Sequence, residues 1–414
     1  MPEPRFHPRF AEKRLVEALA DTPVVLIHGP RQCGKTTLAR KIGDPRGYAY
    51  FSFDDEAALA AAEADPVGFV ANLPERAILG EVQRVPALFP AIESVADSPR
   101  PNGRFLLTAS THVLPAPKRA DSLAGRIETL RLHPLAQCEI AGRAPRFLET
   151  LFAAAFKTRR CERLGAGLAE RIVAGGYPAA LARATGRRPG WYRDYVETLI
   201  QRDVRDLTRM RSLEVLPRLL ALAARQTARL LNVGDLASSP QLSRPTVRDC
   251  VTLLERVFLL DELPSWQSDR LSRLIKTPRL YLGDTGVACA LLGVDASVLA
   301  RDRAFLGQLL KTFIYQELRR QASWHDDEIR FHHFRDKDGA EVDLVLERGA
   351  DRIAGVEVKA ASTVTTADFR GLRKLEQAAG KRFAGGVVLY DGEASTSFGD
   401  RLHAVALGTF FETT

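Results

Sequence analysis

The sequence predicts an α/β protein in three parts: a doubly wound parallel sheet, a middle helical segment, and a C-terminal part mixing helices with paired strands. Three observations predict this class. Short β-rich runs alternate with helix-compatible stretches in the first third, a long helical stretch follows, and beyond Ala304 the pattern becomes helix, hairpin, helix, strand. Because 414 residues exceed one ordinary core, we expect domains at 1–150, 151–300 and 301–414.

The N-terminal sheet is predicted from β-rich runs that recur with regular spacing. Helix-compatible residues separate the runs, and this alternation is typical of parallel sheets that bind ligands at the carboxyl ends of their strands. The runs are Val24–His28, Tyr48–Phe53, Ala77–Leu79, Arg104–Thr108 and Thr129–Leu132.

The first run leads into GPRQCGKTT, which fits the pattern G-x-x-x-x-G-K-[ST] ahead of a helix-compatible stretch. Gly29 and Gly34 allow successive backbone N–H groups to face one anion, and the helix adds the positive end of its dipole. A simple glycine turn before a helix is the alternative. The position at a strand-to-helix junction favours a phosphate-binding loop for a nucleoside triphosphate.

Within this loop, Lys35 is expected to reach the β- and γ-phosphates, and Thr36 to place its hydroxyl on Mg²⁺. ATP and Mg²⁺ are the expected cofactors. The residues expected to contact the nucleotide are Gly29, Pro30, Arg31, Gln32, Cys33, Gly34, Lys35, Thr36 and Thr37.

The composition is that of a water-soluble protein, and we expect a cytoplasmic location. No run of about 18 apolar residues exists, so no membrane partner is expected. The five cysteines lack CxxC or Cys/His spacing, which argues against a disulfide framework or a zinc site. The net charge is +8, and the segment 183–229 holds eleven arginines against five acids. Such a surface attracts nucleic acid, although solvated helix faces explain it equally well.

The middle segment predicts a helix-turn-helix. A helix spans 191–207, then a short helix near Asp235 and a longer helix from Ser243 as N-cap, with Pro245 in its first turn. Runs at 258–263 and 279–282 supply candidate wing strands. The second helix carries Arg244, Arg248 and Arg256 against Asp249 and Glu255, which is weak support for DNA reading. A winged helix used only for packing is the alternative.

Carboxylates and a lysine are predicted to converge in the C-terminal part. The run AEVDLVLE places Asp343 on a strand, and GVEVK places Glu357 and Lys359 on one face of the next. If the strands pair, Asp343 and Glu357 are expected to hold a divalent metal, and Glu317, on an apolar helix face, would be a fourth contributor. A salt-bridged strand pair is the alternative.

Several segments in order resemble one family: GPRQCGKTT, ILGEVQRVPALFPAI, FLLTAS, SLAGRIETLRLHPL and the EVD and EVK pairs. This family is the prokaryotic AAA+-type ATPases with a C-terminal domain of unknown function that has a PD-(D/E)xK nuclease-like fold. The resemblance implies a P-loop core with an additional strand. It also implies a general base at Glu81, a polar sensor at Ser110 or less favourably Thr108, and a transition-state arginine at Arg126.

One departure from the family bears on catalysis. Gly80 precedes Glu81 where the family usually has an Asp that holds the Mg²⁺ shell, so turnover is expected to suffer more than binding. Asp54 or Asp55 is a candidate to compensate. His112 stands where an amide is more usual. Glu81 capping a helix and Arg126 forming a local ion pair are the alternatives for these two residues.

The predicted function is an ATP-binding AAA+-type ATPase whose nucleotide state controls a winged-helix and nuclease-like half that engages DNA. Two rivals remain open: a nucleotide-dependent switch or scaffold with little hydrolysis, and a metal-dependent nuclease that ATP regulates. A nuclease fold that binds DNA without cutting it is a further alternative for the C-terminal part. A homo-oligomer is expected if Arg126 acts on a neighbouring subunit.

Overall fold

The computed structural model describes residues 7–96, 102–112, 125–208, 213–238, 242–267 and 275–411. These residues form two compact units. The first unit comprises Pro8–Leu135 with Arg256–Phe258, and the second comprises the described chain from Ala136 onward apart from that short segment. The chain thus leaves the first unit before residue 150, where a boundary was expected. The division at residue 300 stays a prediction.

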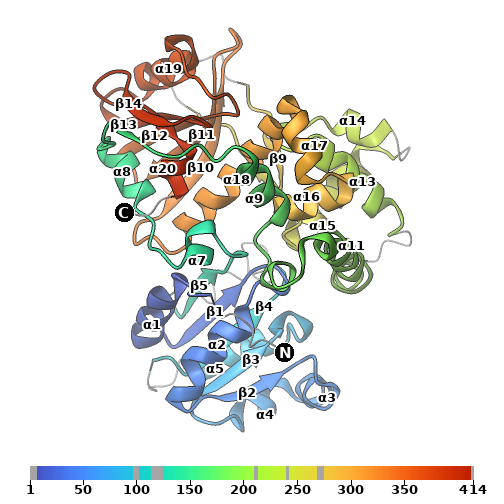
Figure 1. Cartoon of the computed structure of the whole chain (residues 1–414). Coiled ribbons are helices and arrows are strands. Elements are labelled where there is room, and N and C mark those ends of the chain that lie inside the picture. The colour runs from blue at the N-terminus through green and yellow to red at the C-terminus, as the bar shows by residue number, and fades with distance from the viewer. Residues whose placement is uncertain are drawn as a thin grey trace. The chain divides into compact units, whose positions relative to one another are not determined.

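A parallel five-stranded sheet forms the centre of the first unit, in the order β2-β3-β4-β1-β5 (Figure 1). Strand β4 lies between β1 and β3, as expected for a P-loop core with an additional strand. The fold class predicted from the sequence is confirmed. Each strand overlaps one predicted run: β1 (Val24–His28), β2 (Ala49–Ser52), β3 (Ala77–Gly80), β4 (Phe105–Ala109) and β5 (Ile127–Arg131).

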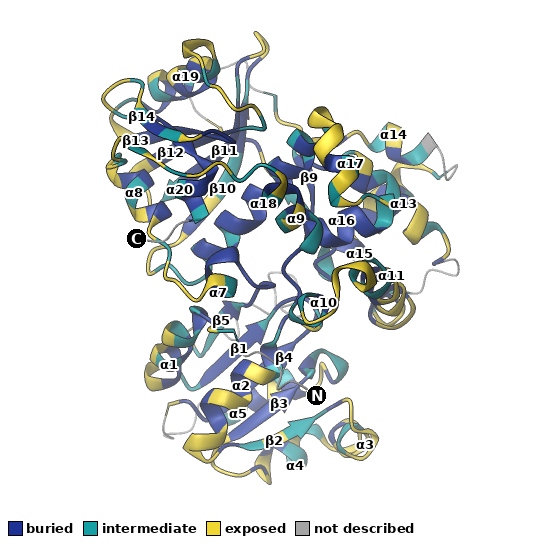
Figure 2. Ribbon diagram, viewed as in Figure 1, coloured by how far each residue is buried: buried dark blue, intermediate teal, exposed yellow. Residues whose placement is uncertain are grey.

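Helices cover this sheet, so its central strands are buried while the outer helix surfaces are exposed (Figure 2). This burial explains why β1 and β4 read as continuous apolar runs rather than alternating ones. Asp55 and Asp65 cap the helices that follow them by accepting backbone N–H bonds. The helices are α1 (Ala11–Asp21), α2 (Lys35–Gly43), α3 (Glu56–Ala64), α4 (Pro66–Ala71) and α5 (Leu88–Ala96).

The second unit begins with helices, and α14 and α15 lie where the two helices of the predicted helix-turn-helix were expected; residues 239–241 of the turn lie outside the described residues. Ser243 caps α15 by accepting the N–H of Thr246 at 3.2 Å, as its sequence position predicts. The predicted helix over 191–207 includes one turn of π-helix at Ile200–Val204. The helices are α7 (Gln137–Ala141), α8 (Phe147–Ala153), α9 (Ala166–Ala174), α10 (Pro178–Leu181), α11 (Arg188–Leu199), α12 (Arg205–Leu207), α13 (Val215–Arg225), α14 (Val233–Ser238) and α15 (Arg244–Arg256).

A small antiparallel sheet follows α15, in the order β7-β9-β8. Strands β8 (Leu260–Leu263) and β9 (Arg279–Leu282) match the two predicted wing strands, whereas β7 (Arg229–Leu230) was not predicted because it is too short to show a pattern. Helices α16 (Thr285–Leu292), α17 (Ala296–Arg301) and α18 (Arg303–Ala322) come next.

The C-terminal sheet has seven strands in the order β10-β11-β12-β13-β15-β14-β6. Strands β11 and β12 form the predicted hairpin, and β12, β13 and β15 run parallel. The later elements are β10 (Ile329–Arg335), β11 (Glu341–Arg348), β12 (Arg352–Lys359), α19 (Arg370–Ala379), β13 (Phe383–Tyr390), β14 (Ala394–Ser397), β15 (Leu402–Ala406) and α20 (Leu407–Phe411).

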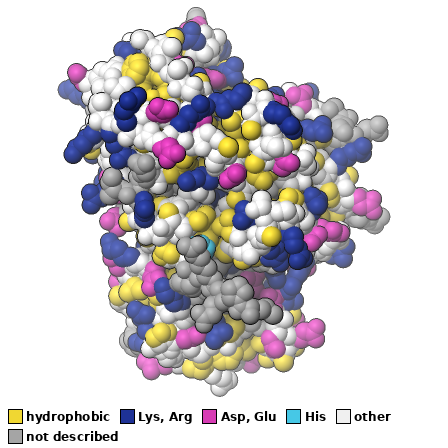
Figure 3. Space-filling model, in the orientation of Figure 1, with side chains coloured by type: hydrophobic (Ala, Val, Ile, Leu, Met, Phe, Trp, Pro, Cys, Tyr) yellow, Lys and Arg dark blue, Asp and Glu magenta, His cyan; other side chains and the backbone are white. Residues whose placement is uncertain are grey.

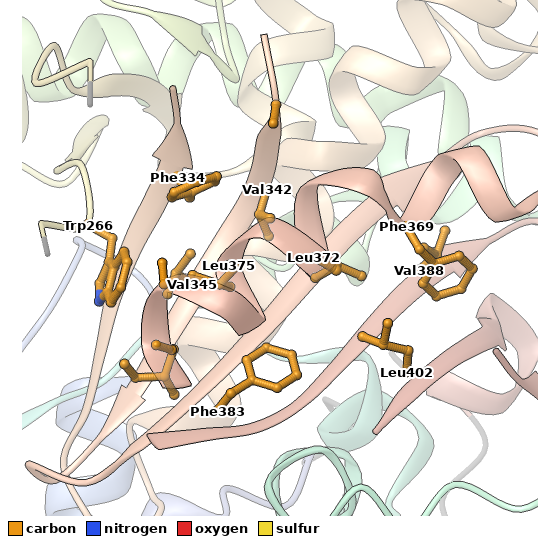
Figure 4. Packing of buried hydrophobic residues seen from close by; sticks show 14 of the residues in the cluster. Trp266, Phe334, Val342, Val345, Phe369, Leu372, Leu375, Phe383, Val388 and Leu402 are labelled. Carbon is orange, nitrogen blue, oxygen red and sulfur yellow. The ribbon is translucent and has the colours of Figure 1, made fainter. Parts of the chain in front are cut away.

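Helix α19 packs its apolar face on this sheet. Leu372 and Leu375 lie against side chains of the strands, among them Val342, Val345 and Val388 (Figure 4). Burying side chains of this size contributes roughly 1.5–3 kcal/mol each to the stability of the fold. The strands that carry Asp343 and Glu357 are therefore held in place by a packed hydrophobic core.

The segment 147–160 packs against this C-terminal sheet and pairs with its edge. The sequence analysis did not predict this association. Strand β6 (Arg159–Arg160) pairs with β14 at the sheet edge. Helix α8 approaches β13 so closely that a Cβ on Gly385 would lie 2.7 Å from the carbonyl oxygen of Leu151. In the described part of the chain, every helix is too short or too polar to span a bilayer.

Candidate functional site

The phosphate-binding loop follows β1 at the carboxyl edge of the first sheet. A side chain at Gly29 would collide with the Leu132 carbonyl oxygen, 2.0 Å from its ideal Cβ, and Gly34 has φ +105°. Cys33 is buried, and burial raises the pKa of its thiol. Cys33 is therefore a packed, inert loop residue.

Lys35 is buried in the loop, with only 4% of the residue exposed. Its Nζ donates to the carbonyl oxygens of Gly29 at 2.9 Å and Pro30 at 3.0 Å, and to Oγ of Ser110 at 3.0 Å. These groups hold the ammonium at the base of the loop. A bound phosphate would have to draw Lys35 away from at least one of them.

Glu81 joins the same hydrogen-bonded chain from the end of β3. Its Oε1 accepts from Oγ of Ser110 at 2.9 Å, and its Oε2 accepts from Nε2 of Gln83 at 2.7 Å. Gln83 in turn accepts the N–H of Ser110 at 3.3 Å, and Thr108 accepts the N–H of Glu81 at 3.3 Å. The structure therefore brings together Lys35, the candidate sensor Ser110 and the candidate base Glu81, whose roles stay predictions.

The backbone at Glu81 is left-handed, with φ +60° and ψ +44°. A non-glycine residue in this conformation carries strain of roughly 1 kcal/mol or more, which tends to persist at functional sites. In this conformation the Glu81 carboxylate accepts the hydrogen bond from Ser110. Gln83 was missed from the sequence, although its amide stands two residues after the candidate base.

A tyrosine hydroxyl occupies the space beside Gly80. An ideal Cβ on Gly80 would lie 2.9 Å from Oη of Tyr50. Asp55 is engaged in capping α3, and Asp54 forms ion pairs with Arg31 at 3.5 Å and Arg84 at 3.2 Å. Both aspartates are thus engaged with other groups in the structure, and compensation by Asp54 or Asp55 for the acid absent at residue 80 stays a prediction.

Arg126 lies at the opposite edge of the sheet from the phosphate-binding loop. It directly precedes β5, whose first residue pairs with Val24 at the amino end of β1, and its guanidinium contacts Glu93 at 3.1 Å. Parallel strands of five residues separate it from the loop by roughly 16 Å. Arg126 therefore lies far from the loop of its own subunit. The resemblance implied a role for Arg126 but did not specify the edge of the sheet on which it lies.

Within the first unit, packed aromatic rings connect the segment that follows β4 to Arg256–Phe258. The N–H of His112 donates to the carbonyl oxygen of Arg256 at 3.0 Å, and its ring lies 4.3 Å from that of Phe258. His28 lies beside both rings. Burial, followed by the charges of Arg131, His112 and Lys35, lowers the pKa of His28 to about 3, so His28 stays neutral.

The C-terminal carboxylates and lysine converge, as predicted from strand pairing. The N–H of Asp343 donates to Oε2 of Glu357 at 3.1 Å, and Nζ of Lys359 lies 3.3 Å from Oε1 of Glu357. Asp343 Oδ2 accepts the N–H of Val358 at 3.0 Å. Asp343 and Glu357 are both buried.

Two cations that the sequence did not indicate complete this ion cluster, which comprises Arg279, Lys311, Asp343, Glu357 and Lys359. Arg279 from β9 donates to Asp343 Oδ1 at 2.7 Å, and Lys311 from α18 donates to the same oxygen at 2.6 Å. Burial raises the pKa of Asp343, but Lys311 and Arg279 outweigh it and lower the pKa to about 2. Burial and Asp343 raise the pKa of Glu357 to about 7.

This arrangement does not fit the predicted divalent metal at Asp343 and Glu357. The Asp343 oxygens are engaged by two cations and a backbone N–H, where a metal ion needs them as ligands. Among the described residues, no group of three or more His, Cys, Asp or Glu side chains is arranged to hold a metal ion. The metal at Asp343 and Glu357 therefore stays a prediction, and it would require Arg279 and Lys311, which strand alternation does not reveal, to release Asp343.

Glu317 belongs to a different buried cluster. Its carboxylate accepts the N–H of Gln137 at 2.8 Å and pairs with Arg320 at 2.7 Å, and Arg320 also donates to Asp284 at 2.9 Å. The sequence showed that a buried Glu317 needs a partner, and it has one. The partner is the arginine one helical turn later, so Glu317 does not contribute to the patch of Asp343 and Glu357.

Three family models match separate parts of the chain. Residues 21–141 match an AAA domain, residues 165–298 match a domain of unknown function (DUF8612), and residues 306–410 match another (DUF4143). The first match coincides with the parallel sheet and phosphate-binding loop. The N-terminal unit is therefore an AAA-type P-loop ATPase domain.

Two curated relatives are uncharacterized proteins of mycobacteria. Mb2031c of Mycobacterium bovis and Rv2008c of Mycobacterium tuberculosis are each 28% identical over 358 residues, covering 86% of this chain and 74% of the relative.

Among solved structures, a Walker-type ATPase of Pyrococcus abyssi has a TM-score of 0.44 and 16% identity, covering 70% of this chain and 98% of that chain. The RuvB Holliday junction branch migration motor of Thermotoga maritima has a TM-score of 0.31 and 20% identity, covering 61% of this chain and 89% of that chain. These likenesses are too distant to carry a functional argument.

Proposed function

We propose that this protein binds and hydrolyses ATP at the loop of residues 29–37, and that its nucleotide state controls a C-terminal half that engages DNA. The observation that carries the ATP part is the hydrogen-bonded chain from Lys35 through Ser110 to Glu81. Phosphoryl transfer needs a cation at the phosphates, a residue that orients water, and a polar group that senses the γ-phosphate. These three side chains meet that need.

The residues of the loop suit a nucleotide. Lys35 is a buried cation whose hydrogen-bond partners in the loop are neutral, so a phosphate would be a stronger acceptor than the Gly29 and Pro30 carbonyls. Thr36, in the first turn of α2, would hold Mg²⁺, which supplies further positive charge at the phosphates when bound. Glu81 would then lose its contact with Ser110 and turn to the attacking water.

The contacts of His112 suggest how the nucleotide state reaches the C-terminal half. Ser110 contacts Lys35, and His112, two residues later, is joined to Arg256 by a hydrogen bond and to Phe258 by ring packing. Arg256 is the last residue of α15, the second helix of the helix-turn-helix. A shift of Ser110 on ATP binding would therefore pull on the end of α15.

DNA is the proposed partner of α15 and the surrounding surface. The exposed side chains of Arg244 and Arg248 lie on α15, although Arg248 also pairs with Glu262 at 3.1 Å. Basic and acidic side chains are interspersed on the visible face of the molecule (Figure 3). The proposed contact is therefore local and does not rely on a single broad basic face.

Self-association is part of the proposal because Arg126 faces away from its own loop. In an assembly, Arg126 would act on the ATP of a neighbouring subunit, where such an arginine is typically worth ~10³ to 10⁵ in rate. Its ion pair with Glu93 would open on assembly.

A switch with little hydrolysis is the second candidate, and the position of Tyr50 favours it. The Tyr50 hydroxyl stands where a Walker B aspartate would extend from residue 80. ATP would then be bound and sensed but turned over slowly. A metal-dependent nuclease is disfavoured because Arg279 and Lys311 engage Asp343.

The experiment compares DNA affinity in two nucleotide states. Fluorescence anisotropy with a labelled duplex is measured in a non-hydrolysable ATP analogue and in ADP, alongside ATP turnover of the same preparation. We expect affinities that differ about fivefold or more, the usual lower range of allosteric coupling. Phe258→Ala should reduce this difference, whereas Phe89→Ala, a partly buried phenylalanine of the same unit, should preserve it. Equal DNA affinity in both states would refute nucleotide control.

A further inference from the structure

A cavity of about 750 Å³ opens beside the ion cluster in the second unit. It is lined by parts of β7, β9, α18, β10, β11 and the end of β12, so both the small sheet and the C-terminal sheet contribute. Six cations line it, against the carboxylates of Asp235 and Glu341; the cations are Arg229, Arg279, Arg303, Lys311, Arg335 and Lys359. We call it the cationic cavity.

The cations at its exposed side have neutral partners. Arg229 donates to the side-chain oxygen of Gln308 at 3.0 Å, and Arg303 donates to the carbonyl oxygen of Ala360. Both arginines are exposed, and within the described part of the chain neither forms an ion pair with a carboxylate. Their charges are therefore available to an anion at little desolvation cost.

The inner cations are held in place by carboxylates. Arg279 is buried and contacts Asp343 and Glu341, while Lys311 contacts Asp343. Arg335 lies 3.7 Å from Glu341, and Lys359 lies within 4 Å of Glu357 and Asp368. These pairs fix the positions of the inner cations, and the lining holds more positive than negative side chains.

We propose that the cationic cavity binds a phosphate group without a divalent metal, with Arg229 and Arg303 as the outer contacts and Lys311 and Lys359 as the inner ones. The volume admits a phosphate with its attached sugar or a second phosphate. A metal is unnecessary because Arg279 and Lys311 already occupy the Asp343 carboxylate and supply the positive charge.

This inference deepens the proposed function and rests on its DNA part, because a nucleic acid strand is one source of such a phosphate. Free diphosphate is the other source of the same chemistry. Binding here would position a strand against β12 without cleaving it, since Arg279 and Lys311 engage the Asp343 carboxylate that a water-activating metal would need.

The test is carried out in the Lys35→Ala background, so that phosphates cannot bind the loop of residues 29–37. Calorimetry with pyrophosphate and anisotropy with a 5′-phosphorylated single strand are measured in EDTA. Removing two charge-assisted contacts by Arg229→Gln/Arg303→Gln should weaken binding about tenfold or more. The matched control is Arg187→Gln/Arg382→Gln, two exposed arginines away from the cavity, which should bind as the parent does.

The two probes separate the sources of the phosphate. If the cavity variant loses binding of both probes, the cavity is a general phosphate site. If it loses binding of the single strand alone, the cavity is a nucleic acid site. Binding that is unchanged in the cavity variant, or that appears only with Mg²⁺, would overturn the inference. The proposed function is tested separately, by the dependence of DNA affinity on nucleotide in the chain with Lys35 intact.

Discussion

Lys35 donates a hydrogen bond of 3.0 Å to Oγ of Ser110, joining the end of β4 to the phosphate-binding loop. Ser110 in turn donates to Glu81, so a cation, a hydroxyl and a carboxylate form one chain across three strands. Lys35 also donates to the carbonyl oxygens of Gly29 and Pro30, and Glu81 also accepts from Gln83. A phosphate that draws Lys35 away therefore removes one donor from the Ser110 hydroxyl, which remains bonded to Glu81.

The first prediction concerns residue 80, the Walker B position at the end of β3. Gly80→Asp alone should lower stability and leave hydrolysis nearly unchanged, because its Cβ would press on the Tyr50 hydroxyl at 2.9 Å. Gly80→Asp with Tyr50→Phe should raise ATP turnover about tenfold, which corresponds to about 1.4 kcal/mol of added transition-state stabilisation. Steady-state phosphate release measures both, with Tyr50→Phe as the control. Equal turnover in all four proteins would mean that the site does not use an acid at residue 80.

The second prediction concerns action between subunits. Arg126→Ala and Lys35→Ala should each be inactive alone, and mixing them should restore part of the ATP turnover because one subunit supplies the loop and the other the arginine. Turnover is measured against mixing ratio. Arg126 lies at the amino edge of the sheet, away from the loop of its own subunit, and pairs with Glu93, so we expect it to act on the ATP of a neighbouring subunit. A monomer with full turnover at high dilution would contradict it.

The third prediction is that Glu255, near the end of α15, makes the stability of the protein depend on pH. Burial and the neighbouring Glu262 raise the pKa of Glu255 to about 7, above the usual range of a glutamate. Folding then favours the protonated acid, so its contribution to stability is present below about pH 4.5 and is lost as the pH rises through about 7. Glu255→Gln keeps an acceptor for the Glu262 N–H and should stabilise the protein above pH 7 by about 1–2 kcal/mol, discounted for partial exposure.

Thermal unfolding from pH 4 to 9, in steps of about one unit, measures this difference as it grows with pH. The exposed Glu214→Gln variant is the control. A stability difference independent of pH would show that Glu255 does not titrate in this range.

Asp343 is predicted to be structural. Asp343→Ala leaves the buried Arg279 and the half-buried Lys311 without their shared partner, so unfolding free energy should fall by about 3–5 kcal/mol. Glu341→Ala removes a partly exposed carboxylate from the same strand and should cost about 1 kcal/mol or less. Denaturant titration compares the two. A stable Asp343→Ala protein that loses Mn²⁺ binding relative to wild type would instead support a metal site.

The elements most visible in the sequence were those fixed by local pattern. The apolar run of β1, the Ser243 cap and the pairing of Asp343 with Glu357 follow from neighbours along the chain or across a hairpin. The contacts of Arg279 and Lys311 could not be predicted in this way. Strand alternation predicts on which face of the sheet a side chain lies, but it does not identify the distant residues that pack over that face. Arg126 was assigned by family resemblance, which does not specify an edge of the sheet.

Glu317 also shows that the sequence does not identify which residue a buried side chain contacts. Its place on an apolar helix face correctly required a partner, but the sequence contains many arginines and does not say which one is near. The partner lies in the same helix, at Arg320. Similarly, β6 joins the C-terminal sheet from a distant part of the chain, and two residues are too few to show a strand pattern.

The central claim is that the loop of residues 29–37 binds ATP through Lys35. Calorimetric titration of ATP with Mg²⁺ should show a loss of affinity of about 100-fold or more in Lys35→Ala, since charge-assisted hydrogen bonds to phosphate contribute roughly 1.5–3 kcal/mol each. Lys41→Ala, an exposed lysine of the same helix paired with Glu12, should bind ATP as wild type does. Unchanged ATP affinity in a folded Lys35→Ala protein would contradict the account.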